Sequence, residues 1–182
     1  MGIDSIMTRA VFLDRDGVIN RPVVREGRPY PPSSIAELVI LPDVPEALQR
    51  LRDNNFYLVV VTNQPDVARG TQTREVVEAM HALLKAQLPI NDFRVCYHDD
   101  ADNCACRKPK PGMILDAAYE FALDLSRSFL VGDRWRDIEA GRRAGCKTLF
   151  IDYQYAETNQ SQPDVKVSSL VEAVTWILKD SN

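Results

Sequence analysis

The stretch Ala10-Val11-Phe12-Leu13-Asp14-Arg15-Asp16-Gly17 places four apolar residues directly before two acidic residues and a glycine. A continuously apolar segment of this length is typical of a strand covered on both faces of a sheet. Two carboxylates two residues apart at a strand end repel each other, and a hard divalent cation such as Mg²⁺ relieves that repulsion. The stretch taken alone also fits an acidic turn, so its meaning depends on the rest of the chain.

Short apolar runs alternate with amphipathic stretches along the whole sequence. We predict strands at 10–13, 57–61, 93–97, 128–131 and 148–151, and helices at 44–54, 73–87, 111–123, 135–144 and 168–178. This βαβ rhythm predicts one α/β domain over residues 1–182, with a doubly wound parallel sheet. Two stretches depart from the rhythm, at 20–40 and 97–111, and a polar loop is expected at 155–164. Both departures follow strand ends, where ligands of open α/β sheets bind.

Two further strand ends carry groups suited to phosphate. Thr62 and Asn63 end the second strand, and Arg107 and Lys108 follow the irregular stretch after the third. Hydroxyl and amide groups can donate hydrogen bonds to phosphoryl oxygens, while Arg offers a fork and Lys a point charge. Thr and Asn are also common turn formers, and a solvated basic loop is an equal alternative for the two cations.

The fourth strand ends in Gly132-Asp133, and Asp137 follows four residues later. Asp133 is placed to complete the metal site that Asp14 begins. Asp137 fits either the site or a structural role as a first-turn acid favoured by the helix dipole.

Composition limits the function classes. The 182 residues carry a net charge of −4 and 45% hydrophobic residues, which is ordinary for one globular domain. The acidic balance argues against a nucleic-acid partner. The apolar runs are too short to cross a membrane, and residues 1–10 lack the pattern of a signal peptide. We therefore expect a cytoplasmic protein, taken to be a monomer, with no nucleic-acid or membrane partner.

Three of the four cysteines lie close together beside one of only two histidines. The pattern Cys96-x-His98-x5-Cys104-x-Cys106 supplies three sulfurs and one imidazole within a loop, 96–106. Four such ligands suit a closed tetrahedral Zn²⁺ site, so a structural zinc is favoured over a catalytic one. Unmetallated thiols are the alternative. Cys146 stands apart in an apolar stretch and is expected to be a buried hydrophobe.

Four successive strand ends supply Asp-x-Asp, Thr, Lys and Gly-Asp-x-x-x-Asp, and in this order they resemble the haloacid dehalogenase (HAD) superfamily. The resemblance implies a five-stranded Rossmann-like core without a large cap domain. It further implies Asp14 as nucleophile through an aspartyl-phosphate, Asp16 as general acid and base, and Thr62 and Lys108 as stabilisers of the phosphoryl group. Mg²⁺ would be held by Asp14, the Asp16 carbonyl and Asp133.

The cysteine loop followed by Arg107-Lys108-Pro109 is similar to the D-glycero-D-manno-heptose 1,7-bisphosphate phosphatase and histidinol-phosphatase branches. This resemblance implies removal of a sugar 7-phosphate in the synthesis of nucleotide-activated heptose for lipopolysaccharide, capsule or glycoprotein glycans. Asn63, Arg107 and Arg25 are the implied substrate contacts. Histidinol phosphate or another small monoester is the alternative substrate, and a non-catalytic zinc-stabilised binding protein is the remaining one.

Two features depart from that branch. Pro29-Tyr30-Pro31-Pro32 is an unexpected insertion, and Pro65-Asp66 stands where the branch usually has Ser-Gly. Proline removes a backbone donor and Asp66 adds negative charge, so the preferred substrate or anomer is expected to be sensitive to this position.

Overall fold

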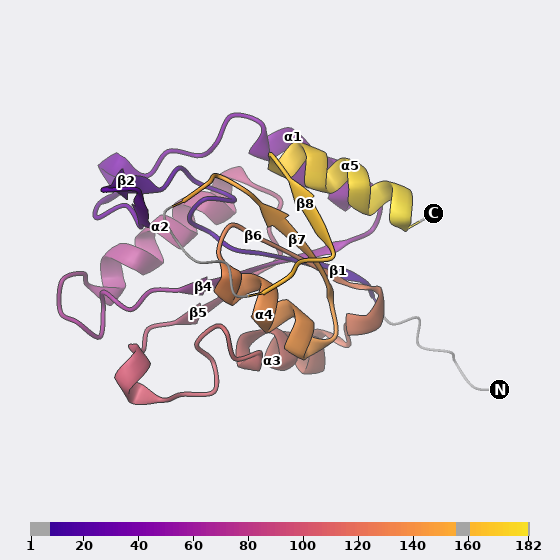
Figure 1. Ribbon diagram of the computed structural model, residues 1–182. Coiled ribbons are helices and arrows are strands. Elements are labelled where there is room, and N and C mark those ends of the chain that lie inside the picture. Colours follow the sequence, from indigo (N-terminus) through magenta and orange to yellow (C-terminus); the bar gives the residue numbers. More distant parts are fainter. Residues whose placement is uncertain (1–7, 156–160, 182) are drawn as a thin grey trace.

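The computed structural model describes residues 8–155 and 161–181. Its strands are β1 (Ala10–Leu13), β2 (Val23–Arg25), β3 (Arg28–Tyr30), β4 (Tyr57–Asn63), β5 (Asp92–Cys96), β6 (Phe129–Gly132), β7 (Lys147–Ile151) and β8 (Val165–Val167). Its helices are α1 (Val44–Asp53), α2 (Arg74–Gln87), α3 (Gly112–Phe121), α4 (Trp135–Ala144) and α5 (Leu170–Asp180), with short 3-10 helices η1 (Ile35–Glu37), η2 (Asp100–Asp102) and η3 (Leu125–Arg127). The predicted alternation of strands and helices is confirmed (Figure 1).

A parallel sheet in the order β5-β4-β1-β6-β7-β8 forms the centre of the molecule (Figure 1). The chain lays down β4 and β5 on one side of β1 and then returns to place β6 on the other side. The strand order therefore reverses at β1. In open α/β sheets this reversal opens a crevice at the carboxyl ends of the strands, where ligands bind.

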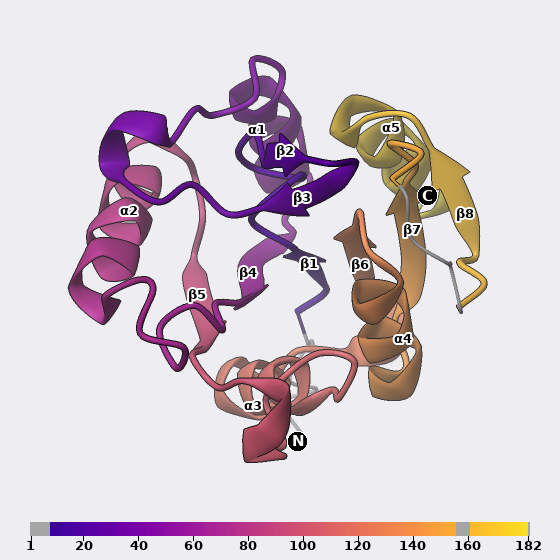
Figure 2. The ribbon, with the colours of Figure 1, turned by 60° about the vertical axis from the view of Figure 1, so that its left-hand side comes forward.

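Side chains of the central strands alternate between two hydrophobic clusters. Val11 and Leu13 of β1 pack in the cluster that includes α1 and α5, while Ala10 and Phe12 pack in the cluster that includes α3. Successive strand residues point to opposite faces, so a strand that is covered on both faces is apolar throughout. Figure 2 shows α1 and α5 on one side of the sheet and α3 and α4 on the other.

The sheet has six strands rather than the five that the family resemblance implied. The sixth, β8, has only three residues and pairs in parallel with β7 at the edge. A segment this short shows no periodicity, and its pairing depends on Asp164, whose carboxylate accepts hydrogen bonds from the backbone and hydroxyl of Thr148. The expected loop 155–164 lies partly outside the described residues, at 156–160.

The irregular stretch 20–40 contains an antiparallel hairpin formed by β2 and β3. Glu26 and Gly27 connect the two strands with positive φ values of 50° and 73°. Two consecutive residues with positive φ suit the primed turns that match the twist of a hairpin. The unexpected Pro29 lies within β3, at the edge of this small sheet, where its missing N–H is tolerated.

Among residues 8–155 and 161–181, no helix is both long and apolar enough to cross a membrane. The expectation about a signal peptide falls largely on residues 1–7, which lie outside the described part of the chain.

Phe56 offers a test of the core. It is fully buried, contacts Phe129 edge-to-face at 6.0 Å between ring centroids, and lies 4.3 Å from the Arg9 guanidinium. We expect Phe56→Ala to lower the free energy of unfolding by about 3–5 kcal/mol, because it leaves a cavity beside Phe129. Tyr119, 94% exposed, is the control, and its replacement by Ala should change stability by no more than about 0.5 kcal/mol. Equal losses in urea unfolding would contradict this packing.

Candidate active site

Three carboxylates gather where β1 and β6 end. Asp14 follows β1, Asp133 follows β6, and Asp137 lies in the first turn of α4. All three are buried, and one oxygen of each lies within 4.8 Å of the others. Three acids this close to one another in a buried site require positive charge nearby.

Lys108 supplies part of that charge. Its ammonium group contacts Asp14 Oδ1 at 2.8 Å and Asp137 Oδ1 at 2.6 Å, and donates to the carbonyl of Val61 at 2.8 Å. The side chain is only 3% exposed. Burial opposes its charge, but the two carboxylates outweigh burial and raise the pKa of Lys108 above its usual value. Lys108 is therefore a permanently charged bridge between two acids.

The pKa of Asp14 is raised to about 6, because burial and the charge of Asp137 outweigh the opposing effect of Lys108. At neutral pH Asp14 is still mostly ionised. A buried carboxylate that accepts from Lys108 and from the Arg15 N–H, each at 2.8 Å, suits both a nucleophile and a ligand of a hard cation.

Asp133 has the most exacting surroundings of the three. Both of its oxygens are buried and no described residue reaches them with hydrogen-bond geometry. Burial, together with Asp14 and Asp137, raises its pKa well above the usual value, and the charge of Arg134 and the nearby Tyr155 hydroxyl lower it by less. Gly17 faces it with φ +93°, and a Cβ at that position would lie 2.0 Å from Asp133 Oδ2. A buried carboxylate without a donor, facing a glycine, fits a cation ligand.

Asp137 has two roles at once. One oxygen contacts Lys108, and the other accepts the backbone N–H of Arg134 at 3.0 Å, which closes the first turn of α4. Gly132 makes room for it, since a Cβ there would lie 2.2 Å from Asp137 Cβ. The two interpretations left open by the sequence, a site residue or a first-turn acid, are both realised by the same side chain.

Asp16 is held from three directions. Its carboxylate accepts hydrogen bonds from Arg15, from Asn20 Nδ2 at 2.9 Å and from Gln64 Nε2 at 3.0 Å. Gln64 also donates to Thr62 Oγ1 at 2.9 Å, which links Asp16 to the end of β4. Thr62 lies beside this network and is buried, with only 1% of its surface exposed.

Arg15 is completely buried and connects Asp16 to His81. Its Nη1 lies 3.1 Å from His81 Nε2, and the imidazole stacks on Phe93. Because the guanidinium can only donate, His81 Nε2 must be the acceptor. Burial and the charge of Arg15 lower the pKa of His81 to about 3, so the ring is neutral. Nothing in the sequence distinguished His81 from a core residue of α2.

Asn63 acts mainly through the backbone of the lysine loop. Its Nδ2 donates to the Lys108 carbonyl at 3.0 Å, and its Oδ1 accepts the Lys108 N–H at 3.1 Å. This reciprocal pair fixes the loop to the end of β4. Asn63 also lines the cavity above the acids.

A cavity of about 590 Å³ opens above the acids. It is lined by the predicted residues Asp14, Asp16, Asn63, Arg107 and Lys108, and by the unpredicted residues Arg28, Tyr30, Asp66, Arg69, Asp100, Arg134, Trp135 and Arg136 among others. Arg25, the predicted contact from the stretch 20–40, is not among the lining residues; it is exposed beside Tyr30, while Arg28 of the same hairpin lines the cavity. The sequence did not predict the hairpin of β2 and β3, so it could not show which of its side chains line the cavity.

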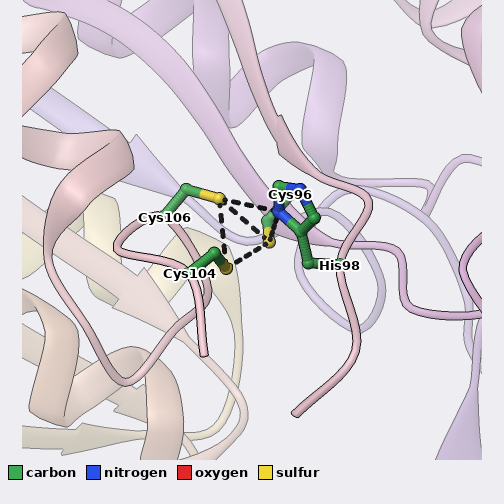
Figure 3. Close-up of side chains that lie close together, drawn as sticks. All are labelled: Cys96, His98, Cys104 and Cys106. Atoms are coloured by element: carbon green, nitrogen blue, oxygen red, sulfur yellow. Dashed lines mark hydrogen bonds between the residues drawn. The ribbon is translucent and has the colours of Figure 1, made fainter. Parts of the chain in front are cut away.

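The cysteine loop brings its four candidate ligands together (Figure 3). The Sγ atoms are 3.7 Å apart for Cys96 and Cys104, 3.2 Å for Cys96 and Cys106, and 3.4 Å for Cys104 and Cys106. His98 Nδ1 lies 3.3 Å from the Cys106 sulfur. Sulfurs about 2.3 Å from a shared tetrahedral zinc are separated by roughly 3.8 Å, so the cluster needs only a slight expansion to hold one.

The three clustered thiols differ: burial raises the pKa of Cys96 and of Cys106, whereas that of Cys104 is lowered. Burial would raise the pKa of Cys104, but hydrogen bonds from the Arg107 N–H and from the two other thiols lower it to about 7. Cys146 is buried elsewhere in the core, and burial raises the pKa of its thiol to about 12, in keeping with its predicted role as a small hydrophobe.

Known proteins resemble this chain in sequence and in structure. Residues 32–145 match the haloacid dehalogenase-like hydrolase family. A D-glycero-beta-D-manno-heptose-1,7-bisphosphate 7-phosphatase of Rhodopseudomonas palustris is 38% identical over 148 residues, covering 75% of this chain and 79% of that protein. A D-glycero-D-manno-heptose-1,7-bisphosphate 7-phosphatase of Thermosynechococcus vestitus is 32% identical over 191 residues, covering 92% and 94%.

The crystal structure of the D,D-heptose 1,7-bisphosphate phosphatase of B. bronchiseptica, complexed with magnesium and phosphate, has the same fold. It superposes with a TM-score of 0.80 at 29% identity, over 94% of this chain and 99% of that one.

The neutral buried His81 makes stability depend on pH. Its pKa is about 3 in the folded chain and about 6.5 when unfolded, so the unfolded state binds the extra proton and stability falls as pH drops below about 6.5. Between pH 7 and pH 5 this contribution is about 2 kcal/mol. His81→Gln keeps an acceptor for Arg15 without titrating. We expect the variant to lose less stability than the wild type over this range in urea unfolding; parallel pH profiles would contradict a neutral His81.

Proposed function

We propose that this chain removes the 7-phosphate of D-glycero-D-manno-heptose 1,7-bisphosphate. The chain belongs to the haloacid dehalogenase-like hydrolase family and to its heptose-1,7-bisphosphate 7-phosphatase branch. The observation that best supports this activity is the buried lysine between Asp14 and Asp137, next to Asp133, whose oxygens accept no hydrogen bond of good geometry from the described residues. This is a centre for an anion and a cation together, which a phosphate monoester bound to Mg²⁺ would satisfy.

The residues fit a bound Mg²⁺. Asp133, whose buried oxygens lack a well-placed donor among the described residues, and Asp14 would hold it, with the backbone carbonyl of Asp16 as the third protein ligand. When bound, the ion would neutralise charge on the phosphoryl oxygens and on the acids. Lys108 keeps Asp137 and Asp14 compensated on the other side.

Asp14 would act as the nucleophile. Its carboxylate oxygen would form a bond to phosphorus as the bond between phosphorus and the sugar oxygen breaks, giving an aspartyl-phosphate and the dephosphorylated sugar. Lys108 and the Thr62 hydroxyl would stabilise the charge on the transferring group. Water would then attack phosphorus, releasing inorganic phosphate and restoring the Asp14 carboxylate.

Asp16 would move the protons of both steps. It would give a proton to the leaving sugar oxygen and later take one from the attacking water. Arg15, Asn20 and Gln64 hold its carboxylate beside the cavity, so these three side chains would set its orientation. His81 would act only through Arg15.

The rim of the cavity would bind the rest of the substrate. Arg107, with Arg28 in place of the expected Arg25, lines the space above the reacting acids. Guanidinium groups bind phosphate through paired N–H donors, so they suit the second phosphate of a bisphosphorylated sugar.

The four ligands Cys96, His98, Cys104 and Cys106 would hold a structural Zn²⁺. All four positions of a tetrahedral ion would be taken by protein, which leaves no place for substrate or water. The ion would stabilise a loop that has little apolar core and that carries Arg107 and Lys108 directly after Cys106.

We further propose that the protein acts in the cytoplasm as a monomeric single domain, in the synthesis of nucleotide-activated heptose. Sugar bisphosphates of this kind are intermediates of small-molecule metabolism, and the cavity is large enough for one such sugar.

Phosphate release from both anomers of heptose 1,7-bisphosphate with Mg²⁺ tests the activity, with histidinol phosphate and an aryl phosphate as comparison substrates. We expect turnover of at least one heptose anomer well above that of the other substrates. Asp14→Asn should lower kcat by at least about 10³-fold, because it removes the nucleophile.

In Asp14→Asn the amide oxygen can still accept from Lys108 and Asp137 still balances its charge, and thermal unfolding of the variant should confirm that it folds. Acid-quenched reactions with substrate carrying ³²P at C7 should leave label on the wild-type chain and none on the variant. Heptose turnover no faster than aryl phosphate turnover, or full activity of Asp14→Asn, would contradict the proposal.

Metal analysis tests the cysteine loop. We expect about one equivalent of zinc per chain, lost in Cys106→Ser because three ligands hold the ion far less firmly. Cys146→Ala is the matched control and should retain its zinc, because Cys146 lies outside the cluster. Protein purified under reducing conditions without any zinc would count against the site.

A further inference from the structure

Three arginines at the rim of the cavity pair with two consecutive acids of the cysteine loop. Arg69 comes from the segment after β4, Arg107 from the segment before α3, and Arg136 from the first turn of α4. Their partners are Asp99 and Asp100, which lie between the candidate ligands His98 and Cys104. Segments far apart in the sequence are thus tied to one short piece of chain.

Asp100 holds two of the guanidiniums. Arg107 donates through Nε to Oδ1 at 2.9 Å and through Nη2 to Oδ2 at 3.4 Å, and Arg136 Nη1 donates to Oδ1 at 2.9 Å. Arg107 also donates to the His98 carbonyl at 3.3 Å. Two cations around one carboxylate leave the pair of guanidiniums with a net positive charge beside the cavity.

Asp99 holds the third guanidinium in a fork. Arg69 donates through Nε to Oδ2 at 2.8 Å and through Nη2 to Oδ1 at 2.7 Å. The two acids are themselves fixed by the start of η2, where the Asp99 N–H donates to Asp102 Oδ2 and the Asp100 N–H to Asp99 Oδ1, both at 2.7 Å. The loop therefore holds all three guanidiniums, with a further, longer contact of 3.5 Å between Arg69 and Asp66.

These ion pairs are poorly placed to stabilise the fold. The Asp100 side chain is 58% exposed, and exposed ion pairs contribute little to folding. Their effect falls instead on binding, because an arginine that is already ordered loses less freedom when an anion arrives. A guanidinium has five N–H donors in a planar fork, so contact with a carboxylate leaves donors for a second anion.

We propose that Asp100 is a positioning residue that orders Arg107 and Arg136 to receive a second phosphate group of the substrate, with Asp99 ordering Arg69 in the same way. The reacting phosphate lies over Asp14 and the second one at this rim. The loop thereby favours bisphosphorylated sugars over monophosphates. This inference rests on the proposed phosphatase function and specifies how its substrate class is selected.

The test compares KM for heptose 1,7-bisphosphate with KM for heptose 7-phosphate, which keeps the reacting phosphate and lacks the other. The wild type should show a lower KM for the bisphosphate. We define the KM ratio as KM for heptose 7-phosphate divided by KM for the bisphosphate. In Asp100→Asn this ratio should fall by about five- to tenfold, mainly because the KM for the bisphosphate rises. The reason is that a neutral amide orders the guanidiniums poorly.

Arg136→Gln should also lower the KM ratio. In the double variant with Asp100→Asn, the KM ratio should fall by less than the product of the two single fold-changes, since both substitutions act on one contact. Asp180→Asn is the matched control: Asp180 forms an exposed ion pair with Lys147 and does not line the cavity. It should leave the ratio unchanged, and thermal unfolding of all variants should confirm that they fold.

An unchanged ratio in Asp100→Asn, additive losses in the double variant, or a stronger preference for the bisphosphate would overturn the positioning role. The last result would mean that Asp100 competes with the substrate. Failure of the proposed function is separate: it would show as absent heptose turnover in the wild type. In that case the KM ratio is measured with fructose 6-phosphate and fructose 1,6-bisphosphate instead. A wild-type protein whose KM is no lower for the bisphosphate would overturn the inference.

Discussion

The ion pairs of Lys108 with Asp14 and Asp137 are the interaction on which the rest of the site depends. A buried ammonium alone would be expensive, and so would two buried carboxylates; together they compensate each other. Removing one partner of such a group typically costs about 3–5 kcal/mol, because the others are left uncompensated. The group also leaves one acid, Asp133, outside the compensated set. The site is thus stable without substrate and still incomplete, which prepares it for a cation and an anion that arrive together.

Delivering Lys108 to this place is a difficult task for the chain, because the lysine lies in a loop rather than in a strand or helix. Three devices hold the loop: the reciprocal hydrogen bonds of Asn63, the Val61 carbonyl and the Cys/His cluster that ends at Cys106. Two of these come from β4, which pairs with β1, and β1 ends directly before Asp14, the proposed nucleophile. The geometry of the reacting groups therefore depends on the sheet register at one end and on the cysteine loop at the other.

The central strands could be predicted because their signals are local, whereas the inner site could be predicted only from four strand ends taken together. Four apolar residues before Asp14, and Gly132 before Asp133, mark strand ends whatever the rest of the chain does. The hairpin of β2 and β3, the strand β8 and the position of Arg28, rather than Arg25, at the cavity could not be predicted in this way. Each of these features involves a strand of only three residues, and three residues are too few to show an alternation of apolar and polar side chains. Such a strand forms only because it pairs with another strand, which its own residues do not reveal. His81 was equally invisible, since its importance comes from a contact with Arg15 on β1's loop across the core.

The inner and outer parts of the site differ in what a substitution would change. Within the buried centre each charge is balanced by the others, so a change there affects folding and chemistry together. At the rim, Asp99 and Asp100 pair with arginines in contact with solvent, where ion pairs contribute only about 0–1 kcal/mol to stability. The rim can therefore vary in sequence without loss of the fold, while the position of each guanidinium relative to the substrate changes. Selectivity for the substrate is most readily altered in this outer layer, and the Asp66 and Asp100 side chains lie in it.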